Sequence, residues 1–228
     1  MQLYDTTLRD GSQGEGISFT VEDKLIITQL LDDLGVHFVE GGWPGANPKD
    51  AQYFERVQDV PLSQSTLVAF TSTSRADVRP SDDPNIVSAL AASTDVVTIV
   101  GKSWDLHVEH VLRTTADQNL RMISDTVLFL RSKGRRIFYD AEHFFDGFKN
   151  NTGYAMKTIE AAIDAGAEVV VLCDTNGGSM PWEVEDIVRR VVNSTSVSVG
   201  IHAHNDCEMA VSNTLAAVQA ERYRFRGR

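Results

Sequence analysis

The chain has 228 residues, 42% of them hydrophobic and 23% charged, so it is long enough to bury the core of one globular domain or two. Acidic residues outnumber basic ones by 32 to 21, and the net charge of −11 argues against a surface for nucleic acid or anionic membranes. No apolar run reaches 18 residues and no signal peptide begins the chain, so we expect a cytoplasmic protein. Two cysteines without CxxC spacing, Cys173 and Cys207, are expected to be reduced.

Short β-branched segments alternate with longer helical patterns along the chain. Two helices carry clear end signals: residues 21–34 follow Thr20 with Asp23 three positions on, and residues 154–165 stop at Gly166. Strands are predicted at residues 2–5, 37–40, 66–71, 95–100, 136–140, 168–172 and 197–201.

The nearly constant spacing of these strands indicates the fold class. Successive strands start 29 to 41 residues apart, which is the repeat of a βα unit and implies parallel strands. This repeat favours an α/β fold of the TIM (β/α)8-barrel type, because a doubly wound nucleotide-binding fold would need a GxGxxG turn after residues 2–5. A seventh helix is expected over residues 207–220, and no eighth βα unit follows it.

The last eight residues differ in composition from the others. Residues 221–228 contain four arginines and one glutamate, whereas residues 1–220 are strongly acidic. The segment is either a natural basic extension or the product of a truncated or frame-shifted reading of a longer chain, and the need of a barrel to close favours the second. We therefore expect a catalytic barrel domain over residues 1–220 and an atypical basic tail over residues 221–228.

Polar residues follow the C-terminal end of every predicted strand, which is where barrel enzymes assemble their active sites. Any one of them could be an ordinary loop residue, but their recurrence at seven successive strand ends indicates a functional site. In chain order they are Arg9, Asp10 and Gln13, then Glu40, then Thr71 and Thr73, then Lys102, then Glu142 and His143, then Asp174, Thr175 and Asn176, and finally His202, His204, Asn205 and Asp206.

His202 and His204 carry the sharpest signal for a metal. Histidines at positions i and i+2 of a strand point to the same side, so both imidazoles can hold one cation. Asp10, at the end of the first strand, would complete a set of two histidines and one carboxylate with open positions for substrate. We expect Mn²⁺ or Mg²⁺, with Co²⁺ and Zn²⁺ as alternatives. The other interpretation is a hydrogen-bonded histidine pair without metal.

Two charged residues are candidates for chemistry. Arg9 beside Asp10 could stabilise an enolate or a developing alkoxide, or it could be only a salt-bridge partner of Asp10. Glu142 could be a general base or the residue that positions one, or else a helix cap or a surface carboxylate.

Three further features have an ordinary structural explanation. Residues 174–178, DTNGG, could place the Thr175 hydroxyl and backbone amides around a substrate carboxylate, but the same residues are good turn formers. For Lys102 a loop cation is the favoured interpretation, and for Cys207 a buried thiol.

Three separated motifs resemble one enzyme superfamily. Residues 5–13 (DTTLRDGSQ), 174–178 (DTNGG) and 202–206 (HAHND) resemble the metal-dependent condensing enzymes and lyases that include isopropylmalate synthase, homocitrate synthase and hydroxymethylglutaryl-CoA lyase. The resemblance covers residues 2 to about 220. Within this superfamily the citramalate synthases are most similar, on residues 14–19 (GEGISF), 40–45 (EGGWPG), 47–50 (NPKD) and 140–147 (DAEHFFDG).

The resemblance implies a metal-assisted Claisen condensation of acetyl-CoA with pyruvate and water, which gives citramalate and CoA and leads toward isoleucine. It also implies small-molecule substrates, and a homodimer for the full-length protein. Isopropylmalate synthase and homocitrate synthase, which differ in the pocket for the oxo acid's side chain, are the nearest alternatives. A non-catalytic barrel remnant that binds a metal or a partner protein is the alternative from a different class.

The resemblance also implies roles for individual residues. Arg9 matches the arginine that stabilises the enolate or carbonyl oxygen, and Glu142 matches the acidic residue near the reacting acyl group. Gln13 and Thr175 match substrate-contacting positions. The positions that match the metal ligands are Asp10, His202 and His204. The family's eighth strand, with a further asparagine near the metal, and its C-terminal regulatory domain have no counterpart in the sequence.

Overall fold

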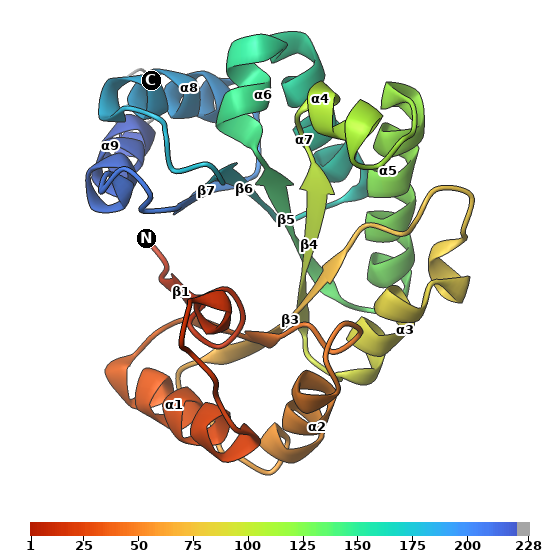
Figure 1. Ribbon diagram of the computed structural model, residues 1–228, viewed down its shortest axis with the longest axis vertical. Helices are drawn as coiled ribbons and strands as arrows, with labels where there is room; N and C mark the ends of the chain where they lie inside the picture. Colours follow the sequence, from red (N-terminus) through yellow and green to blue (C-terminus); the bar gives the residue numbers. More distant parts are fainter. Residues whose placement is uncertain (223–228) are drawn as a thin grey trace. The chain divides into compact units, whose positions relative to one another are not determined.

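The computed structural model describes residues 1–222, and these form two compact units. The first unit comprises Met1–Ile99 and Phe129–Ile137, and the second comprises Val100–Leu128 and the described residues from Phe138 onward. In the sheet each strand is hydrogen-bonded to its neighbours in the chain, in the order β1 to β7 (Figure 1). The chain therefore repeats one βα unit after another, as a parallel α/β fold requires.

The first unit contains the N-terminal strands and their helices. β1 pairs with β2, and β2 with β3, all in parallel. The strands are β1 (Tyr4–Asp5), β2 (Phe38–Gly42), β3 (Thr66–Ser72) and the first part of β4 (Val96–Lys102). The helices are α1 (Val21–Leu34), α2 (Pro48–Val57) and α3 (Pro84–Ala91), with the 3-10 turns η1 (Gly11–Gln13) and η2 (Pro80–Asp82).

Local sequence determines where α1 begins and ends. Thr20 and Asp23 form a reciprocal capping box, in which each side chain accepts the backbone N–H of the other residue. Gly35 ends the helix with φ +82°, a left-handed conformation that glycine adopts without strain. The helix packs its apolar face on a core made of Leu8, Val21, Val36, Val39, Tyr53, Phe54, Val57, Ala69 and Ala92.

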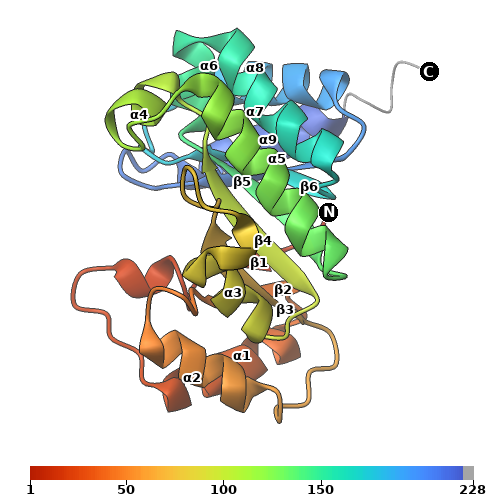
Figure 2. The same cartoon turned by 90° about the vertical axis from the view of Figure 1, so that its right-hand side faces the viewer.

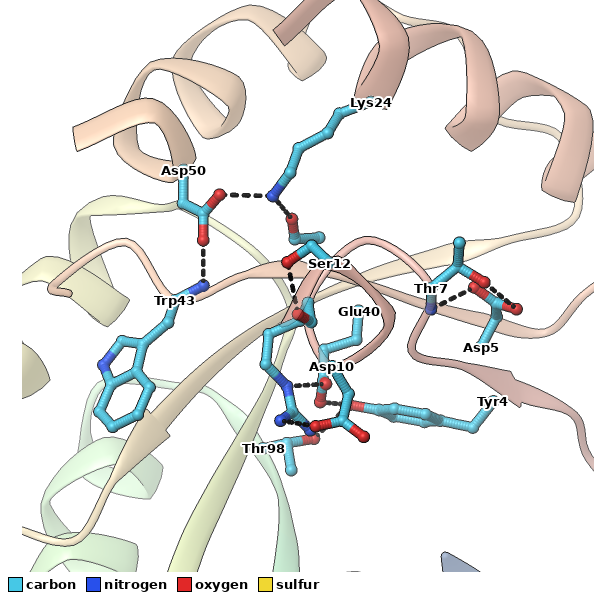
Figure 3. Close-up of polar contacts among 12 residues, drawn as sticks. Tyr4, Asp5, Thr7, Asp10, Ser12, Lys24, Glu40, Trp43, Asp50 and Thr98 are labelled. Carbon is cyan, nitrogen blue, oxygen red and sulfur yellow. Dashed lines mark hydrogen bonds and ion pairs between the residues drawn. The ribbon is translucent and has the colours of Figure 1, made fainter. Parts of the chain in front are cut away.

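A buried ion pair ties α1 and α2 to the end of β2. The Lys24 ammonium group binds the Asp50 carboxylate and donates to the carbonyl oxygen of Gly41 at 3.0 Å, and the Trp43 N–H donates to Asp50 at 2.8 Å (Figure 3). Gly42 has φ +151°, and a Cβ there would lie 2.5 Å from the Asp50 carboxylate. Glycine at this position therefore lets the strand end approach the ion pair.

The second unit contains the remaining strands and most of the helices. β5 (Arg136–Glu142) pairs in parallel with β6 (Val169–Asp174), and β6 with β7 (Ser198–Ala203). The long helix α5 (Ala116–Ser132) is prominent in Figure 2, and its residues up to Leu128 belong to this unit. The other helices are α4 (Asp105–His110), α6 (Phe144–Asn150), α7 (Thr152–Ala165), α8 (Pro181–Ser194) and α9 (Ala210–Arg222).

The core of the second unit follows the helical spacing of apolar residues. Phe144 and Phe145 at the start of α6 are fully buried. α8 packs beside α9 (Figure 1) and has one apolar face, formed by Val184, Ile187, Val188, Val191 and Val192.

All seven strand predictions are confirmed, and the differences lie at the strand ends. β2, β3, β4, β5, β6 and β7 each run one or two residues beyond the predicted end, so the polar residues Lys102, Glu142, Asp174 and His202 also lie inside the strands, as Glu40 was predicted to do. Sequence patterning ends a strand where the apolar residues stop, whereas backbone pairing continues through the polar ones.

The helix predictions differ from the structure at the start of α7 and at both ends of α9. Residues 21–34 are helical as predicted, and α7 begins two residues before the predicted start because Asn151 caps it by accepting the Tyr154 N–H. The last helix begins at Ala210 and not at residue 207. The predicted tail at residues 221–228 lies outside the described residues, except that α9 ends at Arg222. No helix within residues 1–222 is both long enough and apolar enough to span a bilayer.

Candidate active site

The first unit holds a charged network centred on Arg9. Its guanidinium donates from Nε to Glu40 Oε1 at 2.5 Å and from Nη1 to Asp10 Oδ1 at 2.9 Å. The Tyr4 hydroxyl donates to the other Glu40 oxygen at 2.5 Å (Figure 3), and the Phe70 ring lies 3.9 Å from the guanidinium carbon. One cation is thus shared between two carboxylates and covered by an aromatic face.

The loop after β1 holds this network in place through its own backbone. The Asp5 carboxylate accepts both the N–H and the hydroxyl of Thr7, as Figure 3 shows. The carbonyl oxygen of Thr6 accepts the Arg9 N–H at 3.1 Å, and the Ser12 hydroxyl donates to the Arg9 carbonyl at 2.6 Å. Asp5 therefore stabilises the turn of the loop, and the loop orients Arg9 before any ligand binds.

The network supports both interpretations of Arg9, since the arginine does pair with Asp10. Glu40 is fully buried and the Arg9 side chain is 10% exposed, whereas the Asp10 side chain is 22% exposed. Asp10 is thus the more accessible of the two carboxylates that Arg9 binds. Gln13, in η1, is exposed, and its N–H donates to the Asp10 carbonyl oxygen at 3.0 Å.

In the second unit the strand register gathers polar side chains on one face of the sheet. Cys173 pairs with His202, and Asp140 pairs with Val171. Because side chains alternate along a strand, Asp140 and Glu142 share a face with Cys173 and His202. One ligand atom from each of Asp140, Cys173 and His202 lies within 4.8 Å of the others.

The two histidines of the predicted metal site lie together, as their spacing indicates. His202 is in β7 and His204 just follows it, and their ring centroids are 5.2 Å apart. His204 donates its N–H to the Asp174 carbonyl oxygen at 3.2 Å, which fixes the end of β7 against β6. Asp10 belongs to the other unit, and its assignment to the same metal stays a prediction.

The DTNGG motif combines turn formation with an available hydroxyl. Asp174 is buried and accepts both the N–H and the hydroxyl of Ser179, so it closes the turn. Gly177 has φ +61°, and a Cβ there would lie 2.8 Å from an Asp206 oxygen. The Thr175 hydroxyl oxygen accepts the His143 N–H at 2.9 Å and keeps its own proton for donation.

Lys102 is not the loop cation that the sequence suggested. It is the last residue of β4, and its ammonium group forms an ion pair with the Glu142 carboxylate at the end of β5. The side chains are 21% and 24% exposed, respectively. The sequence did offer a signal for this contact, because Lys102 lies at a strand end, as the predicted catalytic residues do.

Three aromatic side chains lie beside this ion pair. The His107 and His143 rings are 4.3 Å apart, and the Trp104 ring is 4.9 Å from His107. Burial lowers the pKa of His107, and the nearby His143 and Lys102 lower it further. Within the described part of the chain, Trp104 Nε1 and His107 Nδ1 are buried without a hydrogen-bond partner from the protein. Neither Trp104 nor His107 is among the site residues predicted from the sequence.

The prediction for Cys207 is wrong. Cys207 is exposed, in the loop between β7 and α9, where the chain turns through Glu208 at φ +57°. Cys173 is the buried cysteine, and both thiols are free.

Known proteins match this chain over nearly its whole length. The HMGL-like family model matches residues 1–223. The (R)-citramalate synthases of Geobacter sulfurreducens and Aquifex aeolicus are each 52% identical to the chain over 96% of its length, which is 41% and 42% of theirs. The homocitrate synthase AksA of Methanopyrus kandleri is 34% identical over the same share of the chain. The chain thus spans about two fifths of the length of the citramalate synthases that it matches.

Solved structures are similar in fold. The HMG-CoA lyase of Bacillus subtilis superposes with a TM-score of 0.79 at 16% sequence identity, over 96% of this chain and 73% of the lyase. The HMG-CoA lyase of Brucella melitensis gives 0.76 at 17% identity, over 96% and 77%. At these identities the comparison shows the fold, which is the TIM-barrel type that the strand repeat predicts.

Proposed function

The chain belongs to the HMGL-like family, and on this basis we propose that it acts in a metal-dependent acyltransferase that condenses acetyl-CoA with pyruvate and water to give citramalate and CoA. The observation that carries the proposal is the difference in sequence identity between two groups of relatives. Five (R)-citramalate synthases are 47–52% identical to the chain, whereas homocitrate and isopropylmalate synthases reach 32–34%. A larger oxo acid is therefore the less favoured substrate.

The proposed metal ligands are Asp10, His202 and His204. The two imidazoles with ring centroids 5.2 Å apart, and a carboxylate that remains partly exposed, have the donor chemistry of a site for Mn²⁺ or Mg²⁺. When bound, such a cation polarises the keto group of the oxo acid. The carboxylate and histidines would hold it, and Arg9 would keep Asp10 oriented.

The proposed role of Arg9 is to stabilise the negative oxygen that forms when acetyl-CoA becomes an enolate. Its charge is held by Glu40 and Asp10 before the substrate binds, so little reorganisation is needed as the oxyanion develops. This arrangement supports an electrostatic role beyond simple neutralisation of Asp10.

The proposed role of Glu142 is to take the proton from the methyl group of acetyl-CoA. Its carboxylate lies on the same sheet face as His202 and is partly exposed, so a ligand can approach it. Thr175, with a hydroxyl proton to donate, would contact a substrate carboxylate, and Gln13 would contact the substrate from η1.

The proposal includes the setting of the enzyme. We place it in the cytoplasm, acting on small molecules, as a homodimer in the full-length protein. The net charge of −11 supports the exclusion of nucleic acid and anionic membranes as partners.

The experiment is an assay of CoA thiol release with pyruvate, 2-oxoisovalerate or 2-oxoglutarate, in Mn²⁺ or Mg²⁺. It uses the chain alone and the chain joined to the parts of the Geobacter relative outside the matched segment. We expect the highest kcat/KM with pyruvate and citramalate as the product. The Asp10→Asn variant should form no citramalate. A preference for a larger acid would refute the choice of substrate, and no turnover by either folded, metal-bound protein would favour a non-catalytic remnant.

A further inference from the structure

The ion pair between Lys102 and Glu142 joins the last residues of two strands of the second unit. Charged residues at strand ends usually extend into water, where an ion pair is weak and interchanges with solvent. Here each side chain is less than one quarter exposed. The pair is thus held in place at the C-terminal ends of the strands, where enzymes of this fold type bind their ligands.

Hydrogen bonds to their carbonyl oxygens hold the backbone of both partners. The Ser103 N–H donates to the Glu142 carbonyl oxygen at 3.1 Å, and Asn119 Nδ2 donates to the Lys102 carbonyl oxygen at 2.8 Å. Gly101 allows a close approach, because a Cβ there would lie 2.6 Å from the Tyr139 hydroxyl oxygen. The backbone of Lys102 is therefore held in place, and the fold determines where its side chain meets Glu142.

The other titratable groups around Glu142 do not replace Lys102. His107 of α4 has a pKa lowered by burial, by His143 and by Lys102, which keeps it neutral near pH 7. His143, which precedes α6, lies 3.4 Å from the Asp146 carboxylate, which also accepts from Asn176. Asp140 lies on the same strand as Glu142 and, as a carboxyl group, can supply no positive charge. Among these groups, Lys102 is the one that forms an ion pair with Glu142.

We propose that Lys102 is a positioning residue for the condensation: its ammonium group orients the Glu142 carboxylate, with which it forms a partly buried ion pair, toward the proton that the carboxylate takes. The inference rests on the proposed role of Glu142. When Glu142 takes the proton from carbon, Lys102 loses its counter-charge, so the pair also favours release of that proton before the next turnover. No group other than this proton is transferred through the pair.

The kinetic test compares Lys102→Met, Lys102→Arg and the control Lys149→Met. Lys149 forms a longer ion pair, at 3.7 Å, with Glu183 in the same unit. We expect Lys102→Met to lower kcat about tenfold or more, with little change in KM, and to move the acidic limb of the pH profile to higher pH. Lys102→Arg restores the limb, and Lys149→Met leaves it unchanged. The proposal would be overturned if the acidic limb of the pH profile did not move in Lys102→Met. It would also be overturned if Lys102→Met lowered kcat by the same factor in a Glu142→Gln background as in the wild-type protein.

A second measurement separates this inference from the proposed function. In protein labelled with ¹³C at the glutamate side-chain carboxyls, the Glu142 signal is identified by its loss in Glu142→Gln and followed with pH. We expect its titration midpoint to rise in Lys102→Met and to return in Lys102→Arg. If the wild-type protein turns over no oxo acid, the proposed function fails while this shift still supports the pair. An unchanged midpoint in folded Lys102→Met protein refutes the pair itself.

Discussion

Arg9 shows how one side chain can serve structure and chemistry together. Its planar fork binds Glu40 and Asp10 at the same time, through different nitrogens, while its face covers Phe70. The buried Glu40 carboxylate needs this partner, since an unpaired charge in the interior is costly. The same contacts leave Asp10 oriented and partly exposed.

Replacement of Arg9 by lysine should separate charge from geometry. An ammonium group is a point charge and cannot bind both carboxylates as the guanidinium does, so we expect kcat to fall by about 10²–10³. KM for pyruvate should change much less. Arg56→Lys is the control, because Arg56 pairs with Glu22 on the surface. An Arg9→Lys enzyme that keeps more than one third of the wild-type kcat would contradict the assignment.

At the scale of the elements, two buried carboxylates attach α1 to its surroundings. Asp50 binds Lys24, which is 2% exposed, and so links α2 to α1 and to β2. Asp32, near the end of α1, accepts the N–H groups of residues 63–65. Both contacts join the helix to segments distant in sequence, so their loss should loosen the packing and not merely the helix end.

Asp50→Ala should destabilise the protein by about 3–5 kcal/mol, because it leaves Lys24 buried without its partner. Chemical denaturation with urea measures the difference. Replacing both residues, with Lys24→Met and Asp50→Leu, should cost less than the single change. Glu22→Gln, which breaks the exposed pair with Arg56, should cost under about 1 kcal/mol. Equal effects of Asp50→Ala and Glu22→Gln would show that burial does not determine the cost.

Asp32 should make stability depend on acid pH. The N–H groups of Ser63, Gln64 and Ser65 hold its pKa well below the usual range. A carboxyl with a folded-state pKa below its unfolded value of about 3.9 contributes stability above pH ~4 and loses it as the pH falls further. Asp32→Asn should therefore lower the urea midpoint of unfolding at pH 7. Between about pH 5 and 2, the midpoint of the variant should fall less steeply with decreasing pH than that of the wild type. An equally steep decline in the variant would exclude Asp32 as the cause.

At the scale of the whole molecule, the proposed metal ligands connect metal binding to stability. Asp10 belongs to the first compact unit, and His202 and His204 belong to the second. A ligand that binds only the folded chain stabilises it by mass action, by about 2.7 kcal/mol at one hundred times its Kd. Metal binding by the proposed ligands should therefore stabilise the folded chain.

Addition of Mn²⁺ should raise Tm, and EDTA should reverse the rise. His202→Ala and Asp10→Asn should each abolish the rise and weaken Mn²⁺ binding, measured by electron paramagnetic resonance, by more than the ~10–100-fold typical of a supporting residue. His110→Ala is the control, because His110 is exposed at the end of α4. Unchanged Mn²⁺ affinity in Asp10→Asn would remove Asp10 from the ligand set.

The sequence by itself determined the repeating βα order, the seven strands, the limits of α1 and the candidate residues at strand ends. These features depend on local periodicity and on capping, which act over a few residues. The pairing of His202 with His204 was also predictable, since it follows from alternation along one strand.

Only the tertiary structure decided which charges meet. Arg9 and Glu40 are 31 positions apart, and Lys102 reaches Glu142 from the neighbouring strand. Such pairs depend on strand register and on the depth at which a helix packs, and no local pattern encodes either. Cys207 is exposed for the same reason, because its burial depended on how the loop after β7 turns and not on its residue type.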